Sequence, residues 1–175
     1  MSLIANKLAI SFIMKAVVIF FIWMILYYGY ILPNGYFNPI LTKALLGSTV
    51  GVLKAIGYDS YNVQNVIYVD GKSSVLVADV CNGLELMVLY VAFFICFPGP
   101  IKHKLIFIPV GLIVLFLINV VREVLLVLNY NYFQKTFEFN HKYTYVFFVY
   151  AAVFLIWRYW LNNYSIIGKQ ISSKG

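Results

Sequence analysis

The sequence predicts an all-α integral membrane protein with about four transmembrane helices, an interfacial helix and a small extracytoplasmic β-hairpin. Of its 175 residues, 63% are hydrophobic and only 11% are charged. Several apolar runs also reach the roughly 18 to 20 residues that a helix needs to cross a bilayer. Since most of the chain lies in spans, we expect residues 1–175 to form a single membrane domain.

The first predicted span covers residues 16–32. Tyr27, Tyr28 and Tyr30 form an aromatic belt at its far end, where such rings sit between headgroups and hydrocarbon. Pro33-Asn34-Gly35 then ends the helix. The apolar run is too long for a usual signal-peptide core and has no small-x-small cleavage site, so we expect it to be a retained span.

The outer loop of residues 33–80 contains two smaller elements. Residues 40–57 are predicted to be a helix, whose two lysines lie about three turns apart and therefore at nearly the same azimuth. That arrangement favours a helix in the membrane interface. Residues 61–80 are rich in β-branched and aromatic residues on either side of Asp70-Gly71, which predicts a β-hairpin.

The remaining spans are predicted at residues 84–98, 105–128 and 143–161. With four spans, the N-terminus, the 99–104 loop and the C-terminal tail share one side, and the lysines there have no acidic residue beside them. All six acidic residues fall at or near the other side. The positive-inside bias therefore places both termini in the cytoplasm. The net charge of +7 is spread along the span edges, which argues against nucleic-acid binding.

Cys81 lies at the mouth of the second predicted span, in Asp79-Val-Cys-Asn-Gly-Leu-Glu85. Asn82 and Glu85 have the spacing of a helix capping box, so a helix would start just after the thiol and favour its thiolate. The Glu85 carboxylate would oppose the thiolate unless a cation neutralised it. Alternatively, Cys81 is a small buried apolar residue, as we expect for Cys96. The two sulfurs would be about 22 Å apart on one helix, too far for a disulfide.

Arg122 is an arginine inside an apolar run, which costs ~2.5 to 3.5 kcal/mol on insertion scales. Asn119 precedes it by three residues and shares its helical face. This polar face, considered together with Cys81, favours a functional role for Arg122. The alternatives are snorkelling to the headgroups or a structural ion pair with Glu123 or Glu85.

His141 precedes the last predicted span, and alone it would be an ordinary surface histidine. The predicted topology, however, places it in the same outer layer as Cys81 and Arg122, where it could act as base toward the thiol and acid toward a leaving amine. One cysteine and one histidine do not make a metal site, so neither a metal nor another cofactor is expected.

These motifs resemble those of the exosortase/archaeosortase family of multi-pass membrane cysteine transpeptidases. The resemblance rests on Cys81-Asn-Gly-Leu after an extended segment, Asn119-x-x-Arg122 late in a span, and His141 at the start of the last span. The chain has about four spans where many members have about eight, which resembles the short exosortase F type. Asparagine also follows the cysteine where the family often has Cys-Ser-Gly.

The resemblance implies a membrane-embedded enzyme that cleaves C-terminal sorting signals of exported proteins at the outer face of the bacterial cytoplasmic membrane. Cys81 would form the thioester, His141 would be the acid/base, and Arg122 would stabilise the oxyanion or thiolate. The supporting or substrate-binding residues would be Asn82, Gly83, Glu85 and Asn119. The expected partners are the client's sorting signal and membrane lipids. The alternative function is a non-catalytic membrane assembly or lipid-binding subunit.

Overall fold

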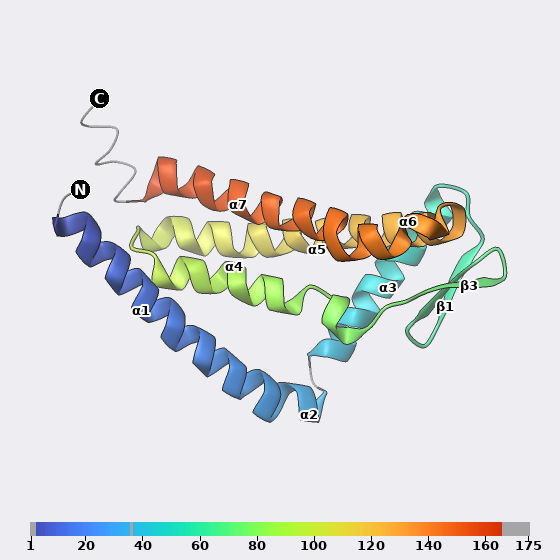
Figure 1. Ribbon diagram of the computed structural model, residues 1–175, viewed down its shortest axis with the longest axis horizontal. Helices are drawn as coiled ribbons and strands as arrows, with labels where there is room; N and C mark the ends of the chain where they lie inside the picture. Colours follow the sequence, from blue (N-terminus) through green and yellow to red (C-terminus); the bar gives the residue numbers. More distant parts are fainter. Residues whose placement is uncertain (1–2, 36, 166–175) are drawn as a thin grey trace.

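The computed structural model describes residues 3–35 and 37–165 and is mostly helical (Figure 1). Its helical elements are α1 (Leu3–Leu26), η1 (Tyr27–Ile31), α2 (Leu32–Asn34), α3 (Asn38–Ala55), η2 (Asp79–Cys81), α4 (Leu84–Cys96), α5 (Ile101–Tyr132), α6 (Gln134–Phe139), η3 (Asn140–Thr144) and α7 (Tyr145–Tyr164). The strands are β1 (Ser60–Val63), β2 (Val66–Val69) and β3 (Lys72–Leu76).

Three helical segments are long and apolar enough to cross a membrane, namely Ile10–Asn34, Ile101–Tyr132 and Gln134–Tyr164. The fourth predicted span, residues 84–98, corresponds to α4, which is apolar but only 13 residues long. A helix of that length rises about 20 Å, less than the roughly 30 Å of a hydrocarbon core. The count of four full spans is therefore not confirmed.

The spanning helices exceed the predicted bounds at several ends. The helix predicted at 105–128 begins at Ile101, directly after Pro100, and ends at Tyr132. The one predicted at 143–161 is continuous with η3 and α6 through two changes of helical geometry. At the end of α2, Gly35 adopts the left-handed conformation (φ 62°), which is the usual way a glycine ends a helix.

The predicted hairpin at 61–80 is a three-stranded antiparallel sheet in the order β1-β2-β3. The Asp70-Gly71 turn joins β2 to β3, and both residues have positive φ, as in a tight hairpin turn. A second turn at Gln64-Asn65 folds the first apolar run back on itself, with Gln64 at φ 50°. No glycine marks this second turn, so the alternation pattern alone did not predict it.

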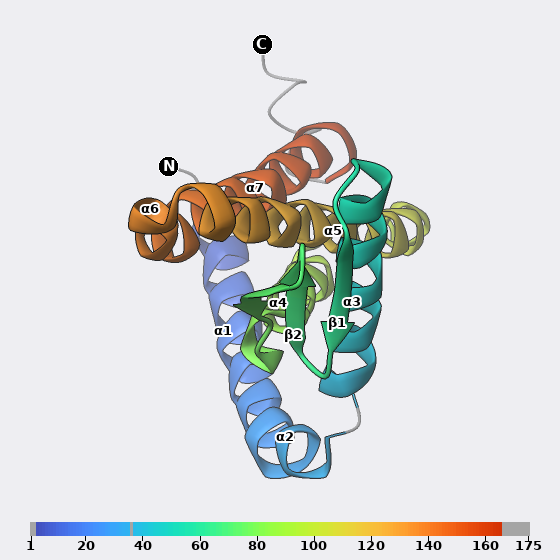
Figure 2. The ribbon, with the colours of Figure 1, turned by 90° about the vertical axis from the view of Figure 1, so that its right-hand side faces the viewer.

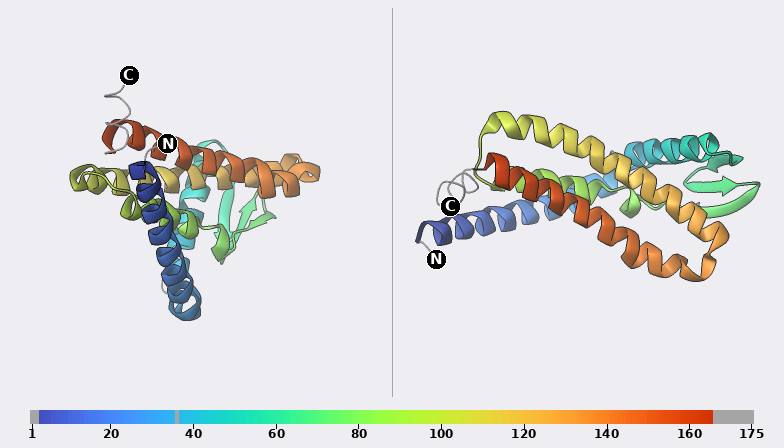
Figure 3. Two further views of the ribbon diagram at one scale, coloured as in Figure 1. Left: turned by 60° about the vertical axis from the view of Figure 1, so that its left-hand side comes forward. Right: turned by 90° about the horizontal axis from the view of Figure 1, so that it is seen from above.

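Figure 1 places the start of α1, the α4–α5 connection and the end of α7 at one end of the molecule. The sheet and α6 lie at the opposite end, and the view onto that end shows α3 beside the sheet (Figure 2). In Figures 1 and 3, α1 runs obliquely to α4, α5 and α7.

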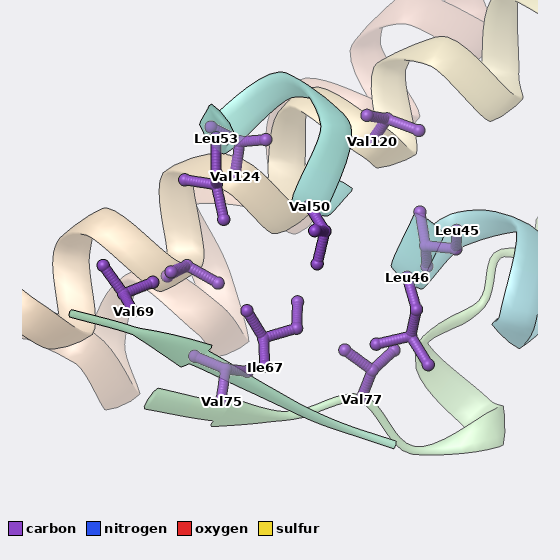
Figure 4. Close-up of a cluster of buried hydrophobic side chains, with 11 residues drawn as sticks. Leu45, Leu46, Val50, Leu53, Ile67, Val69, Val75, Val77, Val120 and Val124 are labelled. Atoms are coloured by element: carbon purple, nitrogen blue, oxygen red, sulfur yellow. The ribbon is translucent and has the colours of Figure 1, made fainter. Parts of the chain in front are cut away.

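A buried apolar cluster joins α3, the sheet and α5 (Figure 4). Its members are aliphatic side chains, including Leu46, Leu53, Ile67, Val77 and Val124. The helix predicted at 40–57 is present as α3, and its lysines are exposed opposite this cluster. The cluster therefore fixes α3 and the sheet to the end of α5 that carries Arg122.

A second buried cluster is rich in aromatic side chains and joins α4, α5 and α7. Tyr90 of α4 packs against α5 at Gly111, where a Cβ atom would overlap the tyrosine hydroxyl. The Tyr90 hydroxyl donates a hydrogen bond to the Phe107 carbonyl (2.8 Å). The small residue allows α4 and α5 to approach closely, as is typical of membrane helix pairs.

Candidate active site

Cys81 ends the short helix η2, ahead of α4, and is half-buried. The predicted capping box at Asn82 and Glu85 is not formed. The helix begins at Leu84 behind Gly83, and the Asn82 backbone N–H donates to the Asp79 carbonyl instead of meeting Glu85. The Asn82 side-chain oxygen nevertheless accepts a hydrogen bond from the Leu84 N–H (2.9 Å), so it satisfies one free donor of α4.

Gly83 allows the chain to turn from η2 into α4. Its φ of 85° lies in the left-handed region, which residues with a Cβ atom rarely adopt. A Cβ atom there would also lie 3.0 Å from the Asn119 side-chain nitrogen. Glycine therefore allows Asn119 to approach the backbone of residues 79–83, which we call the cysteine turn.

The carbonyl oxygen of Cys81 binds to two side chains of α5. Asn119 donates from Nδ2 (3.2 Å) and Arg122 donates from Nη1 (3.4 Å). Arg122 Nη1 also donates to the Asn119 side-chain oxygen (3.2 Å). Within residues 3–35 and 37–165, the structure shows no ion pair between Arg122 and an acidic residue, so the alternative of a structural salt bridge with Glu123 or Glu85 has no support.

His141 lies on the π-helical turn η3, between α6 and α7. Its Nε2 atom is 3.8 Å from Cys81 Sγ, a contact at the outer limit for a sulfur hydrogen bond. The ring stacks on Phe137, one turn earlier (centroids 5.7 Å apart, 15° between planes). Nδ1 has no hydrogen-bond partner among the described residues. The arrangement is thus a cysteine–histidine pair whose ring is oriented by stacking.

Burial raises the pKa of the Cys81 thiol from its ordinary value. The positive charge of the Arg122 guanidinium opposes this increase. The carboxylate that acts on the thiol is that of Glu123, which also raises the pKa, rather than that of Glu85, as the sequence suggested. Glu123 is almost fully buried, and its Oε2 atom has no hydrogen-bond partner among the described residues.

Glu85 is exposed, in the first turn of α4, and contributes to two hollows. One is an apolar groove of about 430 Å³ between α1, α4 and α7, with Trp23 and Ala92 in its walls. The other is a smaller pocket of about 180 Å³, which Arg122 and Tyr150 also line. Glu85 therefore borders both hollows.

Three polar residues of this region were not predicted as site residues. Asn38 and Thr42 of α3 and Asp79 of η2 form hydrogen bonds around the cysteine turn. The available signal was the i, i+4 spacing of Asn38 and Thr42, which places both on one face of a helix. Among the described residues, no group of three metal-ligating side chains could hold a metal ion.

A scan against protein-family models matches the transmembrane exosortase family (Exosortase_EpsH) over residues 3–157. The chain belongs to the transmembrane exosortase family. Searches of curated proteins and of solved structures found no significant match. The exosortase match includes Cys81, Arg122 and His141, and at the level of the family it implies a membrane cysteine transpeptidase.

We predict that Arg122→Gln shifts the pH midpoint of Cys81 alkylation upward. Arg122 is the cation that opposes the effect of burial, and its removal leaves the pKa of the thiol higher. The measurement is the iodoacetamide rate against pH in the detergent-solubilised Cys96→Ala background, where Cys81 is the single thiol.

Arg158→Gln is the matched control, since Arg158 is the other arginine of the chain and lies exposed on α7. This variant should leave the midpoint in place. An unchanged or lower midpoint in Arg122→Gln would contradict the electrostatic role of Arg122.

Proposed function

We propose that this exosortase cleaves C-terminal sorting signals of exported proteins through a thioester on Cys81. The observation that supports this most strongly is the 3.8 Å contact between Cys81 Sγ and His141 Nε2, with Arg122 on the same turn. A histidine at this distance can accept the thiol proton and activate the sulfur. A purely packing role for Cys81 does not explain why the imidazole of His141 lies beside its sulfur.

In the first half-reaction His141 accepts the Cys81 proton, and the thiolate sulfur attacks the carbonyl carbon of the scissile peptide bond. The carbonyl electrons move to oxygen, and Arg122 stabilises the resulting oxyanion. The oxyanion then collapses, and the C–N bond breaks. The leaving amine takes the proton from the His141 imidazolium, so that a thioester and a free amine are formed.

In the second half-reaction an acceptor amine or a water molecule attacks the thioester carbonyl. His141 takes the proton of the attacking group and returns it to the departing Cys81 sulfur, which restores the starting enzyme. An amine gives transpeptidation and water gives hydrolysis.

The reaction takes place at the extracytoplasmic face of the bacterial cytoplasmic membrane. The end of the molecule with the start of α1 and the α4–α5 connection includes Lys102 and Lys104, which the positive-inside bias assigns to the cytoplasm. The opposite end carries the sheet and the cysteine turn. Both termini are then cytoplasmic.

The apolar groove between α1, α4 and α7 is suited to a membrane-embedded segment of the client. It is lined almost wholly by apolar side chains and reaches Glu85, four residues after Cys81. A client segment in this groove would bring the adjoining extracytoplasmic peptide to the thiol. Exposed edges of the small sheet offer a second contact for an extended peptide, by strand addition.

We predict that Cys81→Ala and Cys81→Ser each abolish client cleavage, by roughly 10³-fold or more, because the nucleophile is lost. The measurement is quantitative mass spectrometry of C-terminal peptides from exported proteins, in cells whose own copy is replaced by each variant. Cys96→Ala is the control for loss of a thiol and should retain cleavage, because alanine keeps the apolar lining that Cys96 gives the groove. Normal cleavage in both Cys81 variants would support the alternative of a non-catalytic subunit.

A second prediction tests the groove. Ala92→Trp should reduce client cleavage at least about tenfold by filling the space for a client segment. The Cys81 alkylation rate should not change, since Ala92 lies away from the thiol. Ile95→Trp, on the exposed face of α4, is the matched control and should cleave normally. Equal activity in the two variants would exclude the groove as the client site.

A further inference from the structure

We propose that Asn38 and Thr42, on helix α3, are positioning residues that hold the cysteine turn in its reactive geometry. The inference rests on the proposed function of Cys81 as a nucleophile and adds residues outside the cysteine, arginine and histidine motifs. It identifies α3, an element with no residue among the reacting groups, as part of the catalytic machinery.

Thr42 and Asn38 bind the residues on both sides of Cys81. The Thr42 hydroxyl donates to the Asp79 carboxylate (2.8 Å) and accepts a hydrogen bond from the Asn82 side-chain nitrogen (3.3 Å). The same nitrogen donates to the side-chain oxygen of Asn38 (3.1 Å). The turn is therefore held to α3 two residues before the cysteine and one residue after it.

The contacts of the Asn82 side chain are buried, and the Thr42–Asp79 hydrogen bond is partly buried. Asn38, Thr42 and Asn82 are each 1% exposed. A polar group that loses its partner in such a site is not compensated by water and destabilises the arrangement. Both the amide oxygen and the amide nitrogen of Asn82 are engaged, since the oxygen accepts from Leu84. The network thus has few alternative arrangements.

The two sides of the cysteine turn are held by different helices. On α5, Asn119 and Arg122 bind the Cys81 carbonyl, and on α3, Thr42 binds Asp79. The aliphatic cluster of Figure 4 packs α3 against α5, so the two anchors have a fixed separation. Without the α3 anchor, the turn would be held to the other helices by the Cys81 carbonyl and by the contact of its sulfur with His141. The segment before Cys81 could then shift and move the sulfur relative to Arg122.

The network continues to α1 through Tyr27. Asn38 donates from Nδ2 to the Tyr27 hydroxyl (3.3 Å), at the start of the π-helical turn η1. Tyr27 stacks on Trp23, which lines the client groove (centroids 5.2 Å apart). The positioning contacts therefore extend from the wall of the groove to the cysteine turn.

The test is Thr42→Val, which keeps the shape of the side chain and removes the hydroxyl. In the folded, detergent-solubilised Cys96→Ala background, iodoacetamide alkylation of Cys81 at fixed neutral pH should slow about tenfold, the factor that loss of one hydrogen bond to a charged group can produce. The slowing follows because the thiolate moves away from Arg122. Client cleavage should fall with it, and Thr42→Ser, which restores the hydroxyl, should recover both rates.

Thr49→Val is the matched control. Thr49 lies on the same helix and is equally buried, but its hydroxyl has no hydrogen-bond partner among the described residues. This variant should leave the alkylation rate and client cleavage unchanged. An alkylation rate in Thr42→Val equal to or above that of Thr49→Val would overturn the inference, even if Thr42→Val lowers the melting temperature, because a purely structural contact leaves the thiol of the folded protein unaffected.

The outcome separates the positioning inference from the proposed function. If Cys81→Ala abolishes cleavage but Thr42→Val alkylates and cleaves normally, only the role of α3 is wrong. If Cys81→Ala cleaves normally, the proposed function itself is wrong. A double variant, Thr42→Val with Asp79→Asn, should be no slower than Thr42→Val alone if the two residues act through one hydrogen bond, whereas additive losses would contradict that.

Discussion

The backbone carbonyl of Cys81 is the point on which the rest of the site depends. Asn119 and Arg122 of α5 bind it, and this contact brings the start of the short helix α4 to the side of a long spanning helix. An arginine at membrane depth requires polar partners, and a carbonyl oxygen and an amide oxygen supply them here instead of an acid. Among the described residues the guanidinium forms no ion pair, and its positive charge acts on both the Cys81 sulfur and the Glu123 carboxylate. A salt bridge at this position would have neutralised that charge and left a structural arginine.

The Cys81 thiol and the His141 imidazole come from elements that are far apart in sequence. Cys81 ends a short helix before α4, and His141 lies on a π-helical turn before α7. Such π turns are frequent at functional sites, because the extra residue redirects side chains that a regular helix would place elsewhere. The histidine has a stacked aromatic ring in place of an orienting carboxylate, so its orientation depends on the packing of α6 against α5. Packing and buried hydrogen bonds, more than charge, determine how the thiol and the imidazole face each other.

Much of this fold could be predicted from the sequence. The length of the apolar runs predicted the long helices, and Pro33-Asn34-Gly35 predicted the end of the first one. Asp70-Gly71 predicted the hairpin turn between β2 and β3. The order of Cys81, Arg122 and His141 indicated the exosortase family, which the family match confirms. The prediction of a capping box was wrong because Gly83, in the left-handed conformation, precedes the helix. This conformation depends on tertiary packing, since it allows Asn119 to approach the turn. The roles of Asn38 and Thr42 could not be predicted, since a polar residue on a helix face acquires a partner only when a distant segment packs against it. The effect of Glu123 on the thiol could not be predicted for the same reason, because its proximity to Cys81 depends on where α5 packs against α4.

Covalent catalysis by Cys81 can be measured by mass spectrometry of the enzyme after reaction with a client in the absence of acceptor amines. The peptide containing Cys81 is expected to carry the client fragment that lies on the N-terminal side of the cleaved bond, attached as a thioester and released by hydroxylamine. The Cys96 peptide should be unmodified. Cleavage of the client without an adduct on Cys81 at any reaction time, or with an adduct on Cys96, would show that Cys81 is not the nucleophile.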